Sequence, residues 1–193
     1  MHRLDAPTSG LVLVALDAEE HRRLTVELSE SRMLKLYLAL LWGHPRPSHW
    51  RLDAPLGPDR ADRRRMRVDA GGRPAVTDRA VLGAAPHVAL VALRPRTGRT
   101  HQIRVHLAAA GHPVVGDDLY GGPRHRGVRD PALRAALDPG RTLLHAWRLE
   151  LPERMPSRFE TPPPADLLAA LAACGLDLAA AVTGWRLPAG LSE

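Results

Sequence analysis

Runs of apolar residues along the chain predict a set of strands. The run Leu11–Leu16 is continuously apolar and includes β-branched side chains, which is typical of a buried strand. Residues 45–72 are instead rich in Pro, Arg and Asp and include a basic loop, Arg60–Arg67. Strand patterns also occupy Leu36–Trp42, Pro74–Val81, Val88–Leu93 and Leu143–Leu151.

Helical patterns are fewer. Asp17 precedes the first helix, and Glu20 follows it three residues later, which matches a capping box. A second helix is predicted from His101 to Ala110, with Gly111 at the position where a left-handed residue ends it. Asp166–Cys174 predicts a short Ala/Leu helix. Because strands outnumber helices and come in runs, we expect an α+β fold with a mostly antiparallel mixed sheet and flanking helices.

Length and composition indicate the size of the domain and the sign of its net charge. The 193 residues fit one medium domain, and their 45% apolar content supports a core, built from Leu, Val and Ala because only 4% are aromatic. The formal net charge of +6 favours a polyanionic partner such as nucleic acid. Of the 27 basic residues only Lys35 is lysine. A GC-rich genome explains that ratio, but not the excess of basic over acidic residues.

Other classes of protein are disfavoured. Cys174 is the single cysteine, so the chain has no disulfide framework, which suits a reducing compartment. It lies in a predicted Ala/Leu helix, where we expect its side chain to be packed. No run approaches the length of a membrane span, and no signal peptide is recognisable. We expect a cytoplasmic monomer.

Two separate stretches carry polar side chains on an apolar frame. Near the N-terminus, Arg3 and Asp5 alternate with Leu4, so an extended backbone places both on one face. Taken alone, this segment favours a surface salt bridge or a turn-capping role for Asp5. The second stretch, Arg96–His106, offers several cations and a glycine that permits close approach of a ligand. Together they suggest an enzyme that acts on an anionic substrate.

Cofactor and metal sites are not predicted. His101 and His106 are five residues apart, about 140° out of register on a helix, so they cannot share a metal. The zinc motif His-Glu-x-x-His, the phosphate-binding loop and the dinucleotide-binding glycine motif are all absent. The reaction is therefore expected to need neither a metal nor a nucleotide cofactor.

Several motifs, in order, resemble those of one family. Residues His2-Arg3-Leu4-Asp5-Ala6-Pro7-Thr8-Ser9-Gly10 resemble the catalytic motif His-Arg-Leu-Asp-x-x-Thr-Ser-Gly of the RluA-type pseudouridine synthases. Matches to its other motifs are Lys35-x-Tyr37-x-Ala39 with Trp42-Gly43, Gly98–His106, Gly111-His112-Pro113, Gly116-Asp117-x-x-Tyr120-Gly121 and Leu143–Ala146. The resemblance covers residues 1 to about 165.

This resemblance implies a catalytic domain over residues 1–175, followed by a tail at 176–193. Its expected reaction isomerises a specific uridine of ribosomal or transfer RNA, without a cofactor, after the base is flipped out of the RNA. By the family pattern Asp5 is the catalytic carboxylate, Tyr37 packs on the uracil and Arg104 pairs with Asp5. Arg3 fills the space left by the base. Residues expected to contact RNA are Arg3, Arg99, His101, Gln102, Arg63, Arg64 and Arg65.

The beginning of the chain departs from the family pattern. Members carry several tens of residues, including strands, before this motif, whereas here Met1 stands directly before His2. The family usually has Val at that position, and a GTG codon read as an initiator would turn it into Met. We therefore expect an N-terminally truncated chain, or a misplaced start, with a sheet that lacks its first strands.

Two other functions stay open at this point. One is a non-catalytic RNA-binding relative, which would bind RNA without isomerising it. The other is a metal-dependent RNA hydrolase that uses the histidines, which would lose activity with a chelator.

Overall fold

The computed structural model describes residues 3–30, 32–151, 154, 156–183 and 185. Within them, no helix combines the length and apolar character needed to cross a membrane. The helices are α1 (Ala18–Ser29), α2 (Gln102–Ala109), a 3-10 turn η1 (Arg124–Gly127), α3 (Pro131–Ala136), α4 (Ala165–Ala173) and α5 (Leu178–Val182). The strands are β1 (Ser9–Gly10), β2 (Leu34–Trp42), β3 (His49–Asp53), β4 (Leu56–Pro58), β5 (Met66–Val68), β6 (Val76–Ala85), β7 (Val88–Pro95), β8 (Leu144–Glu150) and β9 (Arg158–Glu160).

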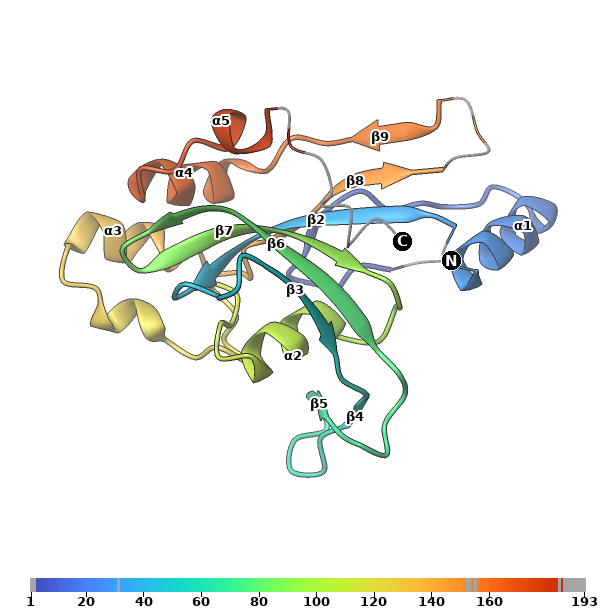
Figure 1. The fold of residues 1–193 in the computed structure, drawn as a ribbon, viewed down its shortest axis with the longest axis horizontal. Coiled ribbons are helices and arrows are strands. Elements are labelled where there is room, and N and C mark those ends of the chain that lie inside the picture. Colours follow the sequence, from blue (N-terminus) through green and yellow to red (C-terminus); the bar gives the residue numbers. More distant parts are fainter. Residues whose placement is uncertain (1–2, 31, 152–153, 155, 184, 186–193) are drawn as a thin grey trace.

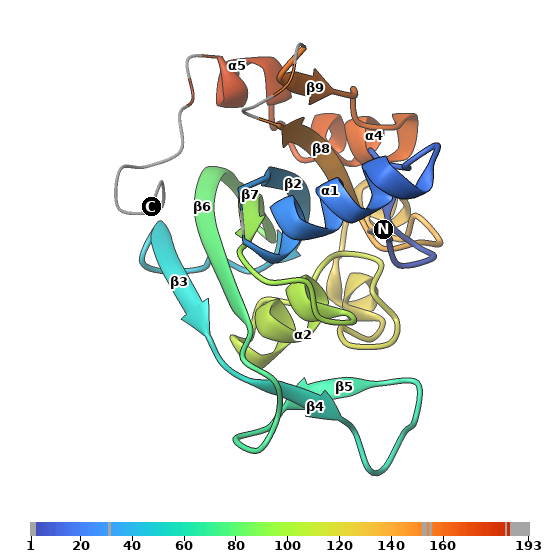
Figure 2. The same cartoon turned by 90° about the vertical axis from the view of Figure 1, so that its right-hand side faces the viewer.

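Seven of these strands form one sheet in the order β1-β8-β2-β7-β6-β3, with β9 beside β8. Every neighbouring pair is antiparallel except β1 and β8, which are parallel. Strands β4 and β5 form a separate hairpin that projects from the body of the molecule (Figure 2). The expected α+β fold with a mostly antiparallel sheet is confirmed.

Strand β2 lies inside the sheet and is covered on both faces (Figure 1). On one face, Ala39 and Leu41 pack with Ile103 and Leu107 of α2. On the other face, alternate residues of β2 pack against α4 and α5. This burial on both sides explains why the sequence of β2 is an almost unbroken apolar run.

The predicted buried strand at Leu11–Leu16 is wrong. Only Ser9–Gly10, just before it, forms a strand. Alternate side chains of the segment pack against a cluster around α1, while Val12 and Val14 are 51% and 67% exposed and Leu16 is 95% exposed. The segment has a packing partner on one side only, so it is half-exposed despite its apolar sequence.

Two further parts of the chain differ from the prediction. Residues 45–72 contain β3, β4 and β5, which are only three to five residues long and mix polar with apolar side chains, so they show no clear strand pattern in the sequence. The basic loop Arg60–Arg67 joins β4 to β5 and ends within β5. In the predicted tail, Leu178 and Val182 of α5 pack against the sheet cluster that contains Trp147.

The predicted capping signals are confirmed. The carboxylate of Asp17 accepts a hydrogen bond of 2.7 Å from the backbone N–H of Glu20 at the start of α1. At the end of α2, Gly111 has a φ of 84°, and its N–H donates to the carbonyl of Ala108. The left-handed Gly111 thus ends α2.

Gly10 holds the N-terminal segment against β8, and we predict that Gly10→Ala destabilises the protein. Its φ is 114°, and a Cβ there would lie 2.2 Å from the carbonyl oxygen of Ala146. Strain and overpacking of this kind cost on the order of 2 kcal/mol or more in free energy of unfolding, measurable by urea denaturation. Gly127→Ala is the matched control, because nothing lies within 4 Å of its added Cβ. Equal stability of the two variants would contradict the prediction.

Candidate active site

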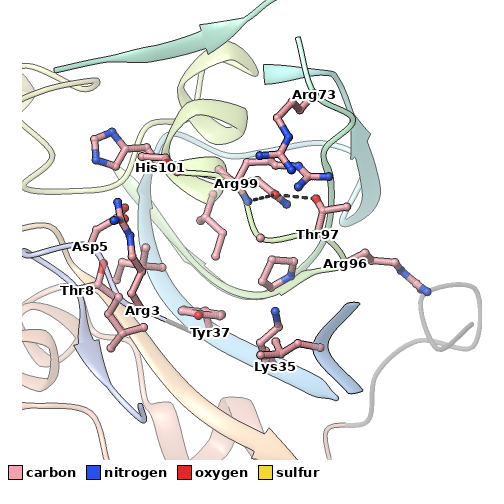
Figure 3. A pocket seen from close by; sticks show the side chains of 18 of the residues that line it. Arg3, Asp5, Thr8, Lys35, Tyr37, Arg73, Arg96, Thr97, Arg99 and His101 are labelled. Atoms are coloured by element: carbon pink, nitrogen blue, oxygen red, sulfur yellow. Dashed lines mark hydrogen bonds between the residues drawn. The ribbon is translucent and has the colours of Figure 1, made fainter. Parts of the chain in front are cut away.

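A cleft of about 710 Å³ opens between the N-terminal segment, β2 and the loop that leads into α2. Figure 3 shows side chains from these elements pointing into it, among them Asp5, Tyr37 and His101. Asp5 is the one carboxylate among the described residues that line the cleft. The cationic side chains that line it are Arg3, Lys35, Arg73, Arg96 and Arg99.

Asp5 is placed by the turn that precedes β1. The N–H of Thr8 donates to the carbonyl of Asp5 at 2.8 Å, and Ser9–Gly10 then pairs with β8. Arg141 steadies the same turn, since its Nη1 donates to the carbonyl of Pro7 at 3.3 Å. The turn thus presents Asp5 at the edge of the sheet, facing the cleft.

Arg104 connects Asp5 to the core of the protein. Its Nη1 lies 3.6 Å from Oδ2 of Asp5. Shorter bonds run from Nε and Nη2 to the two carboxylate oxygens of Asp117, at 2.7 and 2.8 Å. Arg104 and Asp117 are both buried, at 5% and 1% exposure. The closest partner of Arg104 is therefore Asp117, which holds the guanidinium at a fixed place beside Asp5.

Tyr37 presents an uncharged aromatic ring to the cleft. Burial, together with the negative charge of Asp5, raises the pKa of Tyr37 to about 12. Its phenol therefore stays neutral at physiological pH. A neutral aromatic face beside a carboxylate is suited to receive a planar base by stacking.

His101 lies at the start of α2 in a left-handed conformation, with a φ of 55°. Its Nδ1 is 2.8 Å from the hydroxyl of Tyr120, which in turn accepts a 2.8 Å bond from the N–H of Met66. Burial lowers the pKa of His101, against the opposing effect of Asp5. A neutral imidazole can accept the Tyr120 hydroxyl hydrogen on Nδ1, so this network adds no positive charge beside Asp5.

Comparisons with known proteins match this site to one family. A family model described as RNA pseudouridylate synthase matches residues 1–109, which include Asp5, Tyr37 and Arg104. The chain belongs to this family.

The similarity extends over most of the chain. An uncharacterized RNA pseudouridine synthase of Chloroflexus aurantiacus is 42% identical over 170 residues, which cover 86% of this chain and 50% of that relative. The dual-specificity RNA pseudouridine synthase RluA of Escherichia coli is 41% identical over 153 residues, covering 78% of this chain and 65% of RluA. The chain thus spans between half and two thirds of the length of these curated relatives.

Two solved structures are similar as well. The human RNA pseudouridylate synthase domain containing 1 protein is 35% identical with a TM-score of 0.68, and the match covers 90% of this chain and 71% of that one. The domain containing 4 protein is 26% identical with a TM-score of 0.73, covering 92% and 76%. The sheet and its helices are therefore those of the family.

Among the remaining expected site residues, Arg3 and Arg99 line the cleft. One donor of Arg99 is already used within the protein, since its Nε donates to the carbonyl of Pro74 at 2.9 Å. His2, next to Arg3 in the motif, lies outside the described residues.

Gln102 was expected to contact RNA, but its amide is fully used within the protein. Its Oε1 accepts bonds from the Thr97 hydroxyl and the Arg99 N–H, at 2.7 and 3.0 Å. Its Nε2 donates to the carbonyl of Val76 and the hydroxyl of Thr77, at 2.9 and 3.0 Å. These four bonds exhaust its two donors and two acceptor positions. Through these bonds Gln102 stabilises the loop that lines the cleft.

The basic residues of the β4–β5 hairpin do not line the cleft. Arg63 and Arg64 are exposed, and Arg64 forms a bidentate pair with Asp62 at 2.7 and 3.0 Å. Arg65 reaches inward instead, with its guanidinium carbon 5.3 Å from the centre of the Tyr120 ring. The hairpin could contact RNA only beyond the cleft.

Asp117 and Tyr120 had no predicted role, although both lie in the Gly116-Asp117-x-x-Tyr120-Gly121 motif. The ring of Tyr120 lies 5.0 Å from the guanidinium carbon of Arg104, so it contacts the arginine that faces Asp5. The signal was that motif itself, whose spacing does not reveal the partner of either side chain.

Metal binding has no support in the described part of the chain, where no group of three His, Cys, Asp or Glu side chains could hold an ion. His106 is buried, and its two ring nitrogens lie 2.9 Å from the Thr77 hydroxyl and the Ala54 carbonyl. It is therefore a core residue.

We predict that Asp117→Asn strongly destabilises the protein. The substitution removes the charge that neutralises buried Arg104, and breaking a buried pair costs about 3–5 kcal/mol. Urea denaturation measures this loss. Asp118→Asn is the control, because Asp118 is the exposed neighbour. A loss below about 1 kcal/mol would show that solvent or Asp5 replaces Asp117 as the partner of Arg104.

We also predict that tyrosine ionisation in the folded protein is delayed in alkali. The chain has two tyrosines, and burial raises the pKa of both Tyr37, to about 12, and Tyr120. Because the folded protein holds the Tyr37 proton more tightly than the unfolded chain does, the neutral phenol stabilises the fold at pH values below 10.0, the ordinary pKa of tyrosine. This stabilisation is lost as the pH rises from 10.0 toward 12. Phenolate absorbance should therefore rise only above pH 10 or with unfolding, and normal titration at pH 10 in the folded state would refute the burial of both rings.

Proposed function

We propose that this chain isomerises uridine in RNA to pseudouridine. The observation that carries the proposal is the place of Asp5, which lies in a cation-lined cleft with the neutral ring of Tyr37 and forms an ion pair with the buried Arg104. Family membership supports the same chemistry. The reaction breaks the bond from ribose C1′ to uracil N1 and forms one from C1′ to C5. N1 gains a proton and C5 loses one, so neither an oxidant nor a second substrate is consumed.

The geometry supports a part for each side chain in this proposal. The uridine leaves the RNA stack, at a cost of a few kcal/mol, and its base packs on Tyr37. Asp5 then acts on the nucleotide, by attack at C1′ or C6 or by removal of the 2′ proton. Each route uses the carboxylate of Asp5, and the oppositely charged guanidinium of Arg104 lies 3.6 Å from it. Arg3 lines the same cleft and can occupy the vacated stack.

We further propose that the substrate is ribosomal or transfer RNA, and that the chain acts as a monomer in the cytoplasm. The net charge of +6 favours an RNA partner, and the single thiol of Cys174 fits a reducing compartment. Light scattering tests the monomer. Separate assays on the two RNA classes test the substrate.

The predicted outcome is tritium release from RNA labelled at uracil C5. The wild-type chain should release tritium, and Asp5→Asn should reduce release to background because the amide can neither attack nor remove a proton. Asp118→Asn, which changes an exposed carboxylate outside the cleft, should keep full activity. A chelator should have no effect.

Three results would contradict this proposal. RNA binding without release would indicate a non-catalytic RNA-binding protein. Loss of activity with chelator would indicate a metal-dependent enzyme. Undiminished release by Asp5→Asn would show that another group does the chemistry.

A further inference from the structure

Lys35 lies in the cleft but has no part in the reaction described above. It precedes Tyr37 by two residues on β2, and both side chains line the cleft (Figure 3). Leu36 and Leu38, which alternate with them, pack on the opposite face of the sheet. Strand geometry therefore directs the Lys35 ammonium into the same space as the Tyr37 ring.

Within the described residues, no carboxylate forms an ion pair with Lys35. Asp5, the only carboxylate that lines the cleft there, is paired with Arg104. Burial lowers the pKa of Lys35, so the ammonium is partly desolvated without a compensating negative charge. Such an arrangement costs free energy in the unbound protein. The cost is offset if the substrate supplies an anion at this place.

The position also departs from the composition of the chain. Lys35 is the single lysine among 27 basic residues. Arginine is a larger, planar group, whereas the lysine ammonium is a compact point charge that binds one phosphate without stacking on a neighbouring ring. A compact cation beside Tyr37 leaves the aromatic face free for a base.

The surrounding charges identify the kind of anion. Arg73, Arg96 and Arg99 line the cleft together with Lys35, on the side away from Asp5 and Thr8 in Figure 3. Arg96 is paired with Asp78 at 2.5 Å, but no carboxylate pairs with Arg73 or Arg99 in the described part of the chain. Several cations spread along one side of the cleft match a chain of phosphates better than one small anion. The cleft also exceeds the space that a uracil base needs.

We propose that Lys35 binds a backbone phosphate adjacent to the target uridine, in a subsite that Arg73 and Arg99 complete. This inference rests on the proposed function for the identity of the nucleotide. The cleft then holds the flipped uridine together with part of its strand. Lys35 sets the position of that strand relative to Tyr37 and Asp5.

The test compares Lys35→Met and Lys35→Arg with wild type, using bulk transfer RNA and ribosomal RNA fragments. Binding is measured over a range of salt concentrations, and tritium release is measured at saturating enzyme. Loss of one phosphate contact should weaken binding by about tenfold at about 0.1 M salt and reduce the slope of log Kd against log salt by about 0.7–0.9. Lys35→Arg keeps the positive charge and should therefore retain the slope.

Arg22→Met is the matched control, since it removes one cation from the exposed surface of α1 outside the cleft. It should change the slope by less than Lys35→Met does. Thermal melting checks folding, and Lys35→Met should melt no lower than wild type, because it removes an unpaired, partly desolvated charge.

Two results would overturn the inference. An unchanged affinity and slope with a lower saturating rate would place Lys35 at the reacting base. If the affinity, its salt dependence and the saturating rate were all unchanged, the Lys35 ammonium would have no ligand in the RNA. Both differ from failure of the proposed function, which would abolish tritium release by the wild type while the binding and salt measurements still report on the phosphate contact.

Discussion

The buried pair of Arg104 and Asp117 is the interaction on which the site depends. Asp117 fixes the guanidinium through two parallel bonds of 2.7 and 2.8 Å, and Arg104 is then left with Nη1 facing Asp5 at 3.6 Å. Burying two charges is expensive unless their geometry is good and their remaining donors are used. The third contact, to Asp5, is an ion pair at 3.6 Å, which places a second negative charge beside the buried guanidinium. Packing of the core and placement of the candidate catalytic carboxylate are thus the same structural requirement.

The sheet supplies the second requirement, through the alternation of β2. Tyr37 and Lys35 point into the cleft because Leu36 and Leu38 are needed on the other face, where they pack with Trp147. A shift of one residue in register would bury the polar pair and expose the leucines. The apolar cover provided by α5 therefore also fixes which side chains reach the substrate, although α5 lies on the opposite face.

The sequence predicted those elements whose signals are local. Asp17 and Gly111 marked helix ends because a cap is a contact between near neighbours. The segment Leu11–Leu16 was mispredicted because burial depends on which other segments lie beside it. The roles of Asp117 and Gln102 were missed for the same reason, because their partners are distant in sequence. The sequence does not show whether a carboxylate or an amide binds RNA or another group of the protein.

For the proposed RNA substrate, the distribution of charge in the cleft favours one orientation. Asp5 is the only negative group among the described lining residues, and Tyr37 and His101 are held neutral by burial. A phosphate is repelled by Asp5 and attracted by the cations on the far side, whereas an uncharged base incurs no such repulsion. In the proposed complex the strand is therefore drawn to the arginine-rich side, and the uncharged base is left to lie beside the carboxylate. In the proposed reaction, this separation keeps the phosphates away from Asp5 and leaves the reacting bond beside it.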